Sequence, residues 1–266
     1  METVTSADGT EIAYETVGSG PPVILLHGGS GTRRAWDTLV PYLSDGRTLV
    51  IPDRRGRGES GGSVVLSDGD DGQPPTDYTL DKEVADLQAL VDAVEGQPSV
   101  FGHSFGGLVA LAAAETLALD ALVLYEPALL VGEYREDDLA ARMERELRAG
   151  RREAAMALFF EEAGTVDDVQ ELPWWPEEAR LHLAETVIRE NYAVEAYELP
   201  PNFEFETPTL LLTGEHGPEH LREAVFELDD RIPESRVVEL DGVGHVATES
   251  APQRVAGAVE SFVSSV

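Results

Sequence analysis

The sequence predicts an α/β domain with a mostly parallel central sheet, helices flanking that sheet and an inserted helical segment. Short apolar runs such as residues 23–26 and 209–213 alternate with segments whose apolar residues recur at helical spacing. Runs of this kind are typical of strands buried on both faces, and their alternation with helices indicates a parallel sheet. The alternation breaks between residues 128 and 203, and this break predicts the insertion.

The remaining elements follow from turn residues and apolar periodicity. Val4, the Asp8-Gly9 turn and the alternating Ile12, Tyr14 and Val17 predict an N-terminal hairpin. Residues 80–94 carry apolar side chains at helical spacing, and residues 61–77 are a polar loop rich in Gly, Asp and Pro. Further strands are expected at 48–52, 98–101, 121–125 and 236–240, and further helices at 36–43, after Ser104, at 218–229 and at 252–263. The expected core is therefore 1–127 with 204–266, and the expected helical cap is 128–203.

Composition narrows the class of protein. The chain has 266 residues and no cysteine, which excludes disulfides and thiolate metal sites. No run approaches the roughly 20 apolar residues of a membrane helix. The first residues, Met-Glu-Thr-Val-Thr-Ser, lack the basic and apolar regions of a signal peptide. We expect a cytoplasmic protein with no membrane partner.

The charge is strongly negative. The sequence has 51 acidic residues against 19 basic ones, a net charge of −32, and Lys82 is its single lysine. Self-repulsion of this size destabilises a compact chain unless salt screens it, so we expect adaptation to a high-salt cytoplasm. An ordinary acidic protein of a mesophile is the alternative. Nucleic acid is not an expected partner, because phosphate binding requires basic patches.

The stretch Gly102-His103-Ser104-Phe105-Gly106-Gly107 lies between an expected strand and an expected helix. A serine in such a strand–turn–helix stands exposed, where a histidine can take its proton, and the helix N-terminus favours developing negative charge. Gly102 and Gly106 let the strand and the helix pass closely. The alternative is a plain turn whose serine caps the helix.

Four segments together resemble the α/β-hydrolase fold superfamily, in its branch with a serine nucleophile and a helical cap. They are His-Gly-Gly at 27–29, Asp-Arg-Arg-Gly-Arg-Gly-Glu-Ser at 53–60, the Ser104 turn and Asp-Gly-Val-Gly-His at 241–245. The resemblance implies that Ser104 is the nucleophile and His245 the general base. It also implies that the backbone N–H groups of Gly29 and Phe105 form an oxyanion hole.

The acid of the triad departs from the family pattern. The resemblance implies an aspartate after the strand that ends at Gly214, where this chain has Gly214-Glu215-His216-Gly217. Glu126 follows the preceding strand, a position that serves as the acid in some branches of the fold, and we favour it. Glu215 or Glu219 are the alternatives, and a chain with no working acid is the third.

Other candidate residues concern the pocket and metals. The cap contains several aromatic residues, so we expect a mainly apolar pocket, with Trp174, Trp175 and His27 as candidate pocket residues. The resemblance gives His27 a supporting role beside the oxyanion loop. His216 and His220 lie four residues apart but have no acidic partner pattern, so we expect surface or cap-facing positions and no metal.

The expected function is cofactor-free hydrolysis of small, largely apolar carboxylic esters or related acyl bonds through an acyl-enzyme. A perhydrolase or haloperoxidase-like enzyme with the same triad is one alternative. A non-catalytic ligand-binding module on the same scaffold is another. The serine disfavours chemistry that needs a carboxylate nucleophile. The expected partner is a small-molecule substrate, and the oligomeric state is left open.

Overall fold

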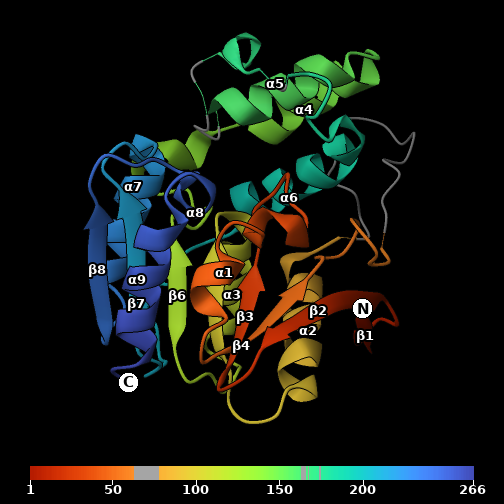
Figure 1. Ribbon diagram of the computed structural model, residues 1–266. Helices are drawn as coiled ribbons and strands as arrows, with labels where there is room; N and C mark the ends of the chain where they lie inside the picture. Colours follow the sequence, from red (N-terminus) through yellow and green to blue (C-terminus); the bar gives the residue numbers. More distant parts are fainter. Residues whose placement is uncertain (63–77, 163–165, 167, 174) are drawn as a thin grey trace.

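The computed structural model describes residues 1–62, 78–162, 166, 168–173 and 175–266. Most of the expected polar loop 61–77, and Trp174, lie outside these residues. Within them, eight strands form one sheet in the order β1-β2-β4-β3-β5-β6-β7-β8 (Figure 1). Only β2 runs antiparallel to its neighbours, so the predicted mostly parallel sheet with a helical insertion is confirmed. The strands are β1 Glu2–Thr5, β2 Glu11–Gly18, β3 Pro22–Leu26, β4 Thr48–Pro52, β5 Ser99–His103, β6 Leu122–Tyr125, β7 Thr209–Gly214 and β8 Ser235–Leu240.

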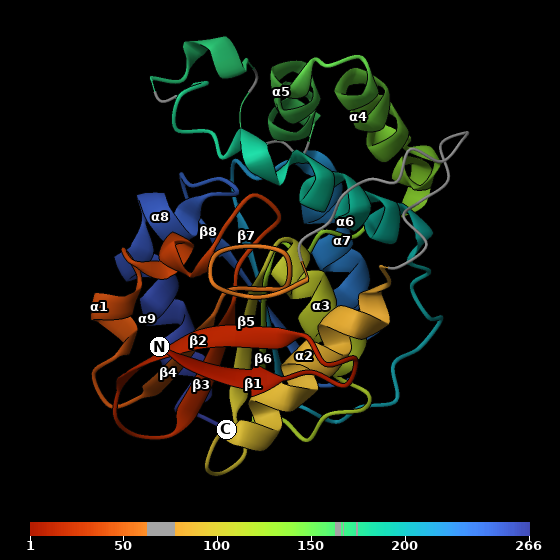
Figure 2. The ribbon, with the colours of Figure 1, turned by 90° about the vertical axis from the view of Figure 1, so that its right-hand side faces the viewer.

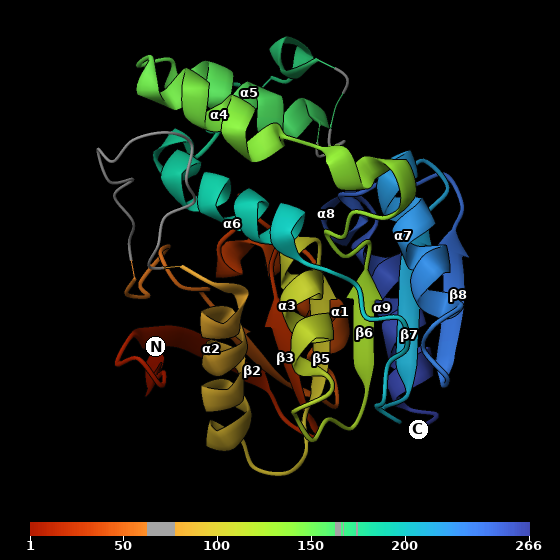
Figure 3. The ribbon, with the colours of Figure 1, turned by 180° about the vertical axis from the view of Figure 1, so that it is seen from behind.

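Helices cover both faces of the sheet because its strands are apolar on both sides. The helices of the core are α1 Val40–Leu43, α2 Leu80–Ala93, α3 Phe105–Ala113, α7 Glu219–Asp229, α8 Ala247–Ser250 and α9 Pro252–Val263. Figure 3 shows α2, α3 and α7 on one face, and Figure 1 shows α1 and α9 on the other. Each face of the sheet has its own apolar core. Val100 belongs to the core under α2, α3 and α7 and its neighbour Phe101 to the core under α1 and α9, as expected for alternating side chains in a buried strand.

The register aligns buried residues across the parallel strands. Leu25 of β3 lies opposite Phe101 of β5, which lies opposite Val123 of β6, and Val123 lies opposite Leu210 of β7. The carboxyl ends of these strands therefore reach one common edge of the sheet. Ligands bind at this edge in parallel α/β sheets.

The chain between β6 and β7 forms the helices above that edge. They are α4 Leu139–Arg148, α5 Arg152–Glu162 and α6 Ala184–Ala196, which share a separate apolar core (Figure 2). In Figures 1 and 3, α6 lies between the sheet and the other two helices. The predicted limits of this cap, 128–203, stay a prediction.

One expected helix is replaced by two short turns. Residues 36–43 were expected to form one helix, but the structure has a 3-10 turn at Arg33–Trp36 and then α1 at Val40–Leu43. Pro41 lies in the first turn of α1, where its missing N–H costs nothing, and it cannot continue a helix that starts earlier. In the described part of the chain, no helix is long and apolar enough to cross a membrane.

Candidate active site

Ser104 lies in a strained turn between β5 and α3. Its backbone has φ 54° and ψ −122°, a conformation that non-glycine residues rarely adopt. The turn needs glycine nearby, because a Cβ on Gly106 would lie 2.2 Å from the carbonyl oxygen of Leu26. The N–H of Ser104 donates to the carbonyl oxygen of Tyr125 at 3.0 Å, which ties the turn to the end of β6.

Glu126 follows β6 directly and is fully buried. It also has a positive φ of 41°. Its Oε1 accepts hydrogen bonds from the Thr213 hydroxyl and the Gly214 N–H, both at 2.8 Å, and its Oε2 lies 2.7 Å from Nδ1 of His245. Burial alone raises the pKa of this carboxyl, but the hydrogen bonds with His245, Gly214 and Thr213 outweigh it and lower the pKa below its ordinary value. Glu126 is therefore ionised at neutral pH.

Gly217 explains how Glu126 reaches this place. A Cβ at Gly217 would lie only 2.0 Å from Oε1 of Glu126. The glycine therefore leaves empty the volume that the Glu126 carboxylate fills from the neighbouring strand. The two alternative acids lie elsewhere: Glu215 is exposed and accepts from the Gly242 N–H at 2.7 Å, and Glu219 is exposed at the start of α7.

Two side chains form hydrogen bonds to the backbone of the loop that carries His245. The Tyr125 hydroxyl donates to the carbonyl oxygen of Gly244 at 2.7 Å, and Nε2 of His103 donates to the carbonyl oxygen of His245 at 2.9 Å. Burial, with a smaller effect of His245, lowers the pKa of His103 to about 3, so His103 stays neutral. Because Nδ1 of His245 is bonded to Glu126, its Nε2 is the ring nitrogen left for a reacting group.

His27 does not line a pocket in the described residues. It is fully buried, its Nδ1 donates to the carbonyl oxygen of Gly28 at 2.9 Å, and its Nε2 accepts from the N–H of Arg54 at 3.2 Å. Burial and the nearby Arg54 charge hold its pKa well below the usual range, so the ring is neutral. These contacts place His27 beside the loop that carries Gly29, and the supporting role that the family resemblance implies stays a prediction.

Buried charges connect this loop to the cap. Arg54 donates to the carbonyl oxygens of His27 and Gly28 at 3.1 and 3.3 Å, and Arg57 donates to that of Gly28 at 3.4 Å. Both guanidinium groups also bind Oε1 of Glu190 on α6, and Arg54 forms a second ion pair with Glu83 on α2. We call Arg54, Arg57, Glu83 and Glu190 the ion cluster. The Asp-Arg-Arg-Gly-Arg-Gly-Glu-Ser segment supported the family resemblance, but nothing in its sequence predicted that Glu190, 136 residues after Arg54 and 133 after Arg57, is the partner of both arginines.

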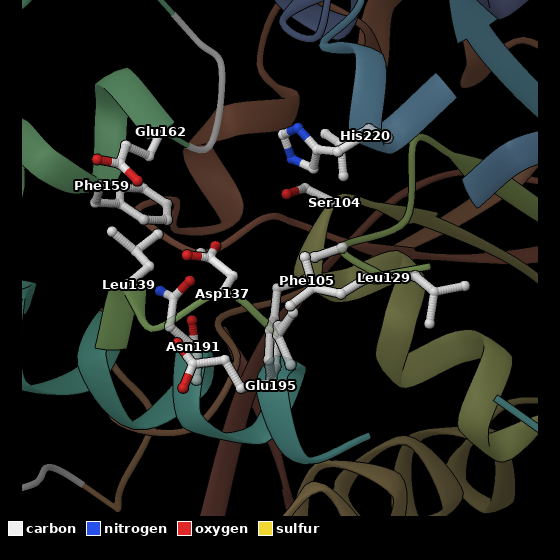
Figure 4. A pocket seen from close by; sticks show the side chains of 16 residues that line it. Ser104, Phe105, Leu129, Asp137, Leu139, Phe159, Glu162, Asn191, Glu195 and His220 are labelled. Carbon is white, nitrogen blue, oxygen red and sulfur yellow. The ribbon is translucent and has the colours of Figure 1, made fainter. Parts of the chain in front are cut away.

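Two chambers meet at Ser104, and both include Gly29 and Phe159. The α6 chamber, shown in Figure 4, lies under the cap and is lined by Phe105, Leu129, Asp137, Glu195 and His220, among others. The His245 chamber lies on the other side and is lined by His245, His103, Phe160, Arg180 and Glu249, among others. Gly29 and Phe105, the expected oxyanion donors, therefore both line the α6 chamber together with Ser104. The N–H of Phe105 belongs to the first turn of α3, where helix geometry leaves it unpaired.

The remaining candidate pocket and metal residues differ in whether they line a chamber. Trp175 is 9% exposed and packs edge-on against Phe160 in the cap core, and it lines neither chamber. His216 is exposed, whereas His220, expected at the surface or facing the cap, lines the α6 chamber. No group of residues in the described ranges has the arrangement of a metal site.

Known proteins resemble this chain over different lengths. A solved alpha/beta hydrolase from Sphaerobacter thermophilus is 31% identical, covers 97% of this chain and 100% of its own, and superposes with a TM-score of 0.74. A thermophilic esterase from Thermogutta terrifontis is 25% identical, with 99% and 98% coverage and a TM-score of 0.76.

Curated relatives match over shorter segments. A non-heme chloroperoxidase from Streptomyces lividans is 37% identical over 40% of this chain and 36% of its own length. A 2-hydroxy-6-oxo-6-(2'-aminophenyl)hexa-2,4-dienoic acid hydrolase from Metapseudomonas resinovorans is 30% identical over 52% and 46%. These matches span less than half of each relative. The model of the alpha/beta hydrolase family matches residues 23–258, which include β3 to β8 except for the first residue of β3, the Ser104 turn and His245, and the chain belongs to that family.

Proposed function

We propose that this protein is a serine hydrolase that cleaves small carboxylic esters through an acyl-enzyme, with Ser104, His245 and Glu126 as its triad. The observation that carries the proposal is the buried Glu126 carboxylate, 2.7 Å from Nδ1 of His245, on a loop beside the strained Ser104 turn. A buried, ionised carboxylate that orients a histidine beside a strained serine turn is the arrangement of a catalytic triad, and this supports an enzyme over a non-catalytic scaffold. Support also comes from the solved esterase that covers nearly the whole chain.

The chemistry needs no group beyond these residues. His245 Nε2 takes the Ser104 proton while the serine oxygen bonds to the ester carbon, and Glu126 stabilises the imidazolium. The N–H groups of Gly29 and Phe105 stabilise the oxyanion. The carbon–alkoxide bond then breaks as His245 returns the proton to the leaving oxygen. Water repeats the sequence on the acyl-enzyme and releases the acid, so Ser104 is regenerated.

The walls of the chambers favour a small substrate with a mainly apolar body. Leu129, Leu139, Val194 and Phe159 line the α6 chamber, and Phe160 and Leu172 line the other. Apolar walls on both sides of Ser104 are compatible with hydrolysis of an ester whose acyl and alcohol parts are apolar.

A second candidate is perhydrolysis, in which hydrogen peroxide replaces water as the attacker of the acyl-enzyme and the product is a peracid. The match to a chloroperoxidase over 111 residues favours it. Peroxide-dependent halogenation of monochlorodimedone in acetate would support this candidate, and its absence alongside ester hydrolysis would reject it.

The first experiment is hydrolysis of p-nitrophenyl acetate and butyrate, with Ser104→Ala beside the wild type. We expect Ser104→Ala to lower kcat by about 10⁴-fold or more, because the acyl-enzyme cannot form. Labelling of the wild type by a fluorophosphonate, absent in Ser104→Ala, is the companion measurement. A folded wild type that is neither active nor labelled would favour the binding-module alternative.

Replacing Glu126 by its uncharged isostere tests the acid. Glu126→Gln should reduce kcat by roughly 10²–10⁴-fold with KM little changed, because His245 loses its orientation and its counter-charge. Glu215→Gln and Glu219→Gln are the matched controls and should stay within about threefold of the wild type, as surface changes do. A large loss in either control with near-normal turnover of Glu126→Gln would transfer the assignment to that residue.

The space at Gly217 allows a test in which the carboxylate that faces His245 comes from position 217, after β7, in place of Glu126, after β6. Gly217→Asp alone should abolish most activity, because the new carboxylate occupies the volume held by Glu126. Combining it with Glu126→Gly should raise kcat at least about tenfold above the single variant, since one carboxylate again faces His245 without a like charge beside it. Steady-state kinetics with circular dichroism as the folding check measures both. No recovery in a folded double variant would contradict the shared-volume argument.

The ion cluster predicts a positioning role for Glu190. Glu190→Gln should lower kcat about tenfold and leave KM nearly unchanged, because loosening Arg54 and Arg57 disturbs the oxyanion loop, which acts in the transition state. Glu185→Gln, which removes a cap ion pair with Arg152, is the control and should leave kcat unchanged within about twofold. An equal effect of both variants would instead indicate a general loss of cap stability.

A further inference from the structure

The two chambers bind different parts of the substrate. His245 returns its proton to the leaving oxygen, so the leaving group must occupy the chamber that His245 lines. The acyl group then occupies the α6 chamber, which shares Ser104, Gly29 and Phe105 with the reacting carbonyl. This assignment rests on the proposed function.

The α6 chamber is acidic where it is not apolar. Asp137, Glu162, Glu190 and Glu195 line it, and its lining includes no lysine or arginine in the described residues (Figure 4). The sequence stretches outside the description, 63–77, 163–165, 167 and 174, contain neither residue type. The one titratable base on the wall, His220, is neutral at pH 7, because burial and the nearby His245 lower its pKa to about 4.

Two of these carboxylates form no salt bridge in the described part of the chain, although the charge of Arg142 acts on Asp137. Glu162 is paired with Arg142, and Glu190 with Arg54 and Arg57. Asp137 and Glu195 form no salt bridge, and the one hydrogen bond to the Glu195 carboxylate comes from the N–H of Ala140 at 2.8 Å. Burial and the charges of Asp137 and Asp138 raise the pKa of Glu195 to about 7, which reflects an environment that lacks a positive charge.

An unused acceptor beside the oxyanion loop points to the same ligand. The Glu190 side chain is 1% exposed, and its Oε2 has no hydrogen-bond partner, although Oε1 binds two arginines. Oε2 lies beside Gly29, 3.6 Å from where a Cβ on that residue would stand. A buried acceptor left open in this way needs a donor, and the chamber that it lines is where a substrate would bring one.

We propose that the acyl group of the substrate carries a protonated amine, which binds between the carboxylates of Asp137 and Glu195 in the α6 chamber. The free Glu190 oxygen accepts a hydrogen bond from an N–H of the same acyl group. The apolar side chains Leu129, Leu139 and Val194 contact its methylene carbons. The substrate class is therefore an amino-acyl ester. The reaction is unchanged: the Ser104–carbon bond forms, the alcohol leaves with a proton from His245, and water releases the amino acid.

The test compares esters that differ only in the amine. p-Nitrophenyl β-alaninate is matched with the butyrate, and the 6-aminohexanoate with the heptanoate, because an ammonium replaces a methyl group in each pair. We expect the wild type to prefer the ammonium member by at least about tenfold in kcat/KM, after subtraction of spontaneous hydrolysis. Asp137→Asn/Glu195→Gln should reduce this preference to about unity.

The matched control removes the same charge from outside the chamber. Glu153→Gln/Glu198→Gln changes two exposed carboxylates of the 128–203 region that do not line the α6 chamber. It should keep the preference within about twofold, since distant exposed charges are screened. Equal loss of preference in both double variants would overturn the proposal and assign the effect to the overall charge of −32.

A second measurement uses the unaltered enzyme, so it does not depend on the folding of a variant. Butylammonium should inhibit butyrate hydrolysis competitively, whereas butanol at the same concentration should not. Ser104-dependent butyrate hydrolysis without ammonium preference or inhibition would overturn the amine proposal and leave the proposed function standing. No Ser104-dependent hydrolysis of any ester would overturn both.

Discussion

The contact between Glu126 and His245 is the constraint on which the site depends. An ionised carboxylate that is fully buried requires compensation, and here three donors supply it: His245, the Thr213 hydroxyl and the Gly214 N–H. Thr213 and Gly214 belong to the end of β7 and His245 to the loop after β8, so Glu126, which follows β6, connects three segments at the sheet edge. The positive φ of Glu126 is the strain that this arrangement must balance.

The oxyanion loop depends on a different set of buried charges. Arg54 and Arg57 each bond both the loop carbonyl of Gly28 and the Glu190 carboxylate on α6. The cap and the loop that carries Gly29 therefore share partners, and a displacement of α6 would leave Arg57 buried without its carboxylate and Arg54 with Glu83 alone. Because that state is costly, the cap helix nearest the sheet is the one least free to move.

The sequence predicted the sheet well because buried parallel strands are short apolar runs, as at residues 48–52, where expectation and structure coincide. It predicted that His245 and Ser104 belong together only through the family resemblance. The sequence favoured Glu126 over Glu215 from its position at a strand end, which stays a prediction, and the empty volume at Gly217 that accommodates the Glu126 carboxylate appears only in three dimensions. The same limit applies to His220 on α7 and to Trp175 in the cap, because helical spacing does not say which side chains line the pocket and which pack into a core.

The expectation of a mainly apolar pocket took the aromatic residues of the cap as its walls, and Phe159 and Phe160 do line the chambers, whereas Trp175 packs inside the cap. Glu190, Asn191, Val194 and Glu195 also face the α6 chamber, from one side of α6 at the spacing of adjacent helical turns. In a chain this acidic, the presence of a single carboxylate does not indicate a binding site, because most carboxylates are solvated. Glu195 of α6 differs because it lines the α6 chamber and forms no salt bridge in the described residues, and under our proposal it selects for a cation there. An acidic side chain of this chain thus discriminates between ligands only where burial keeps water from solvating its carboxylate.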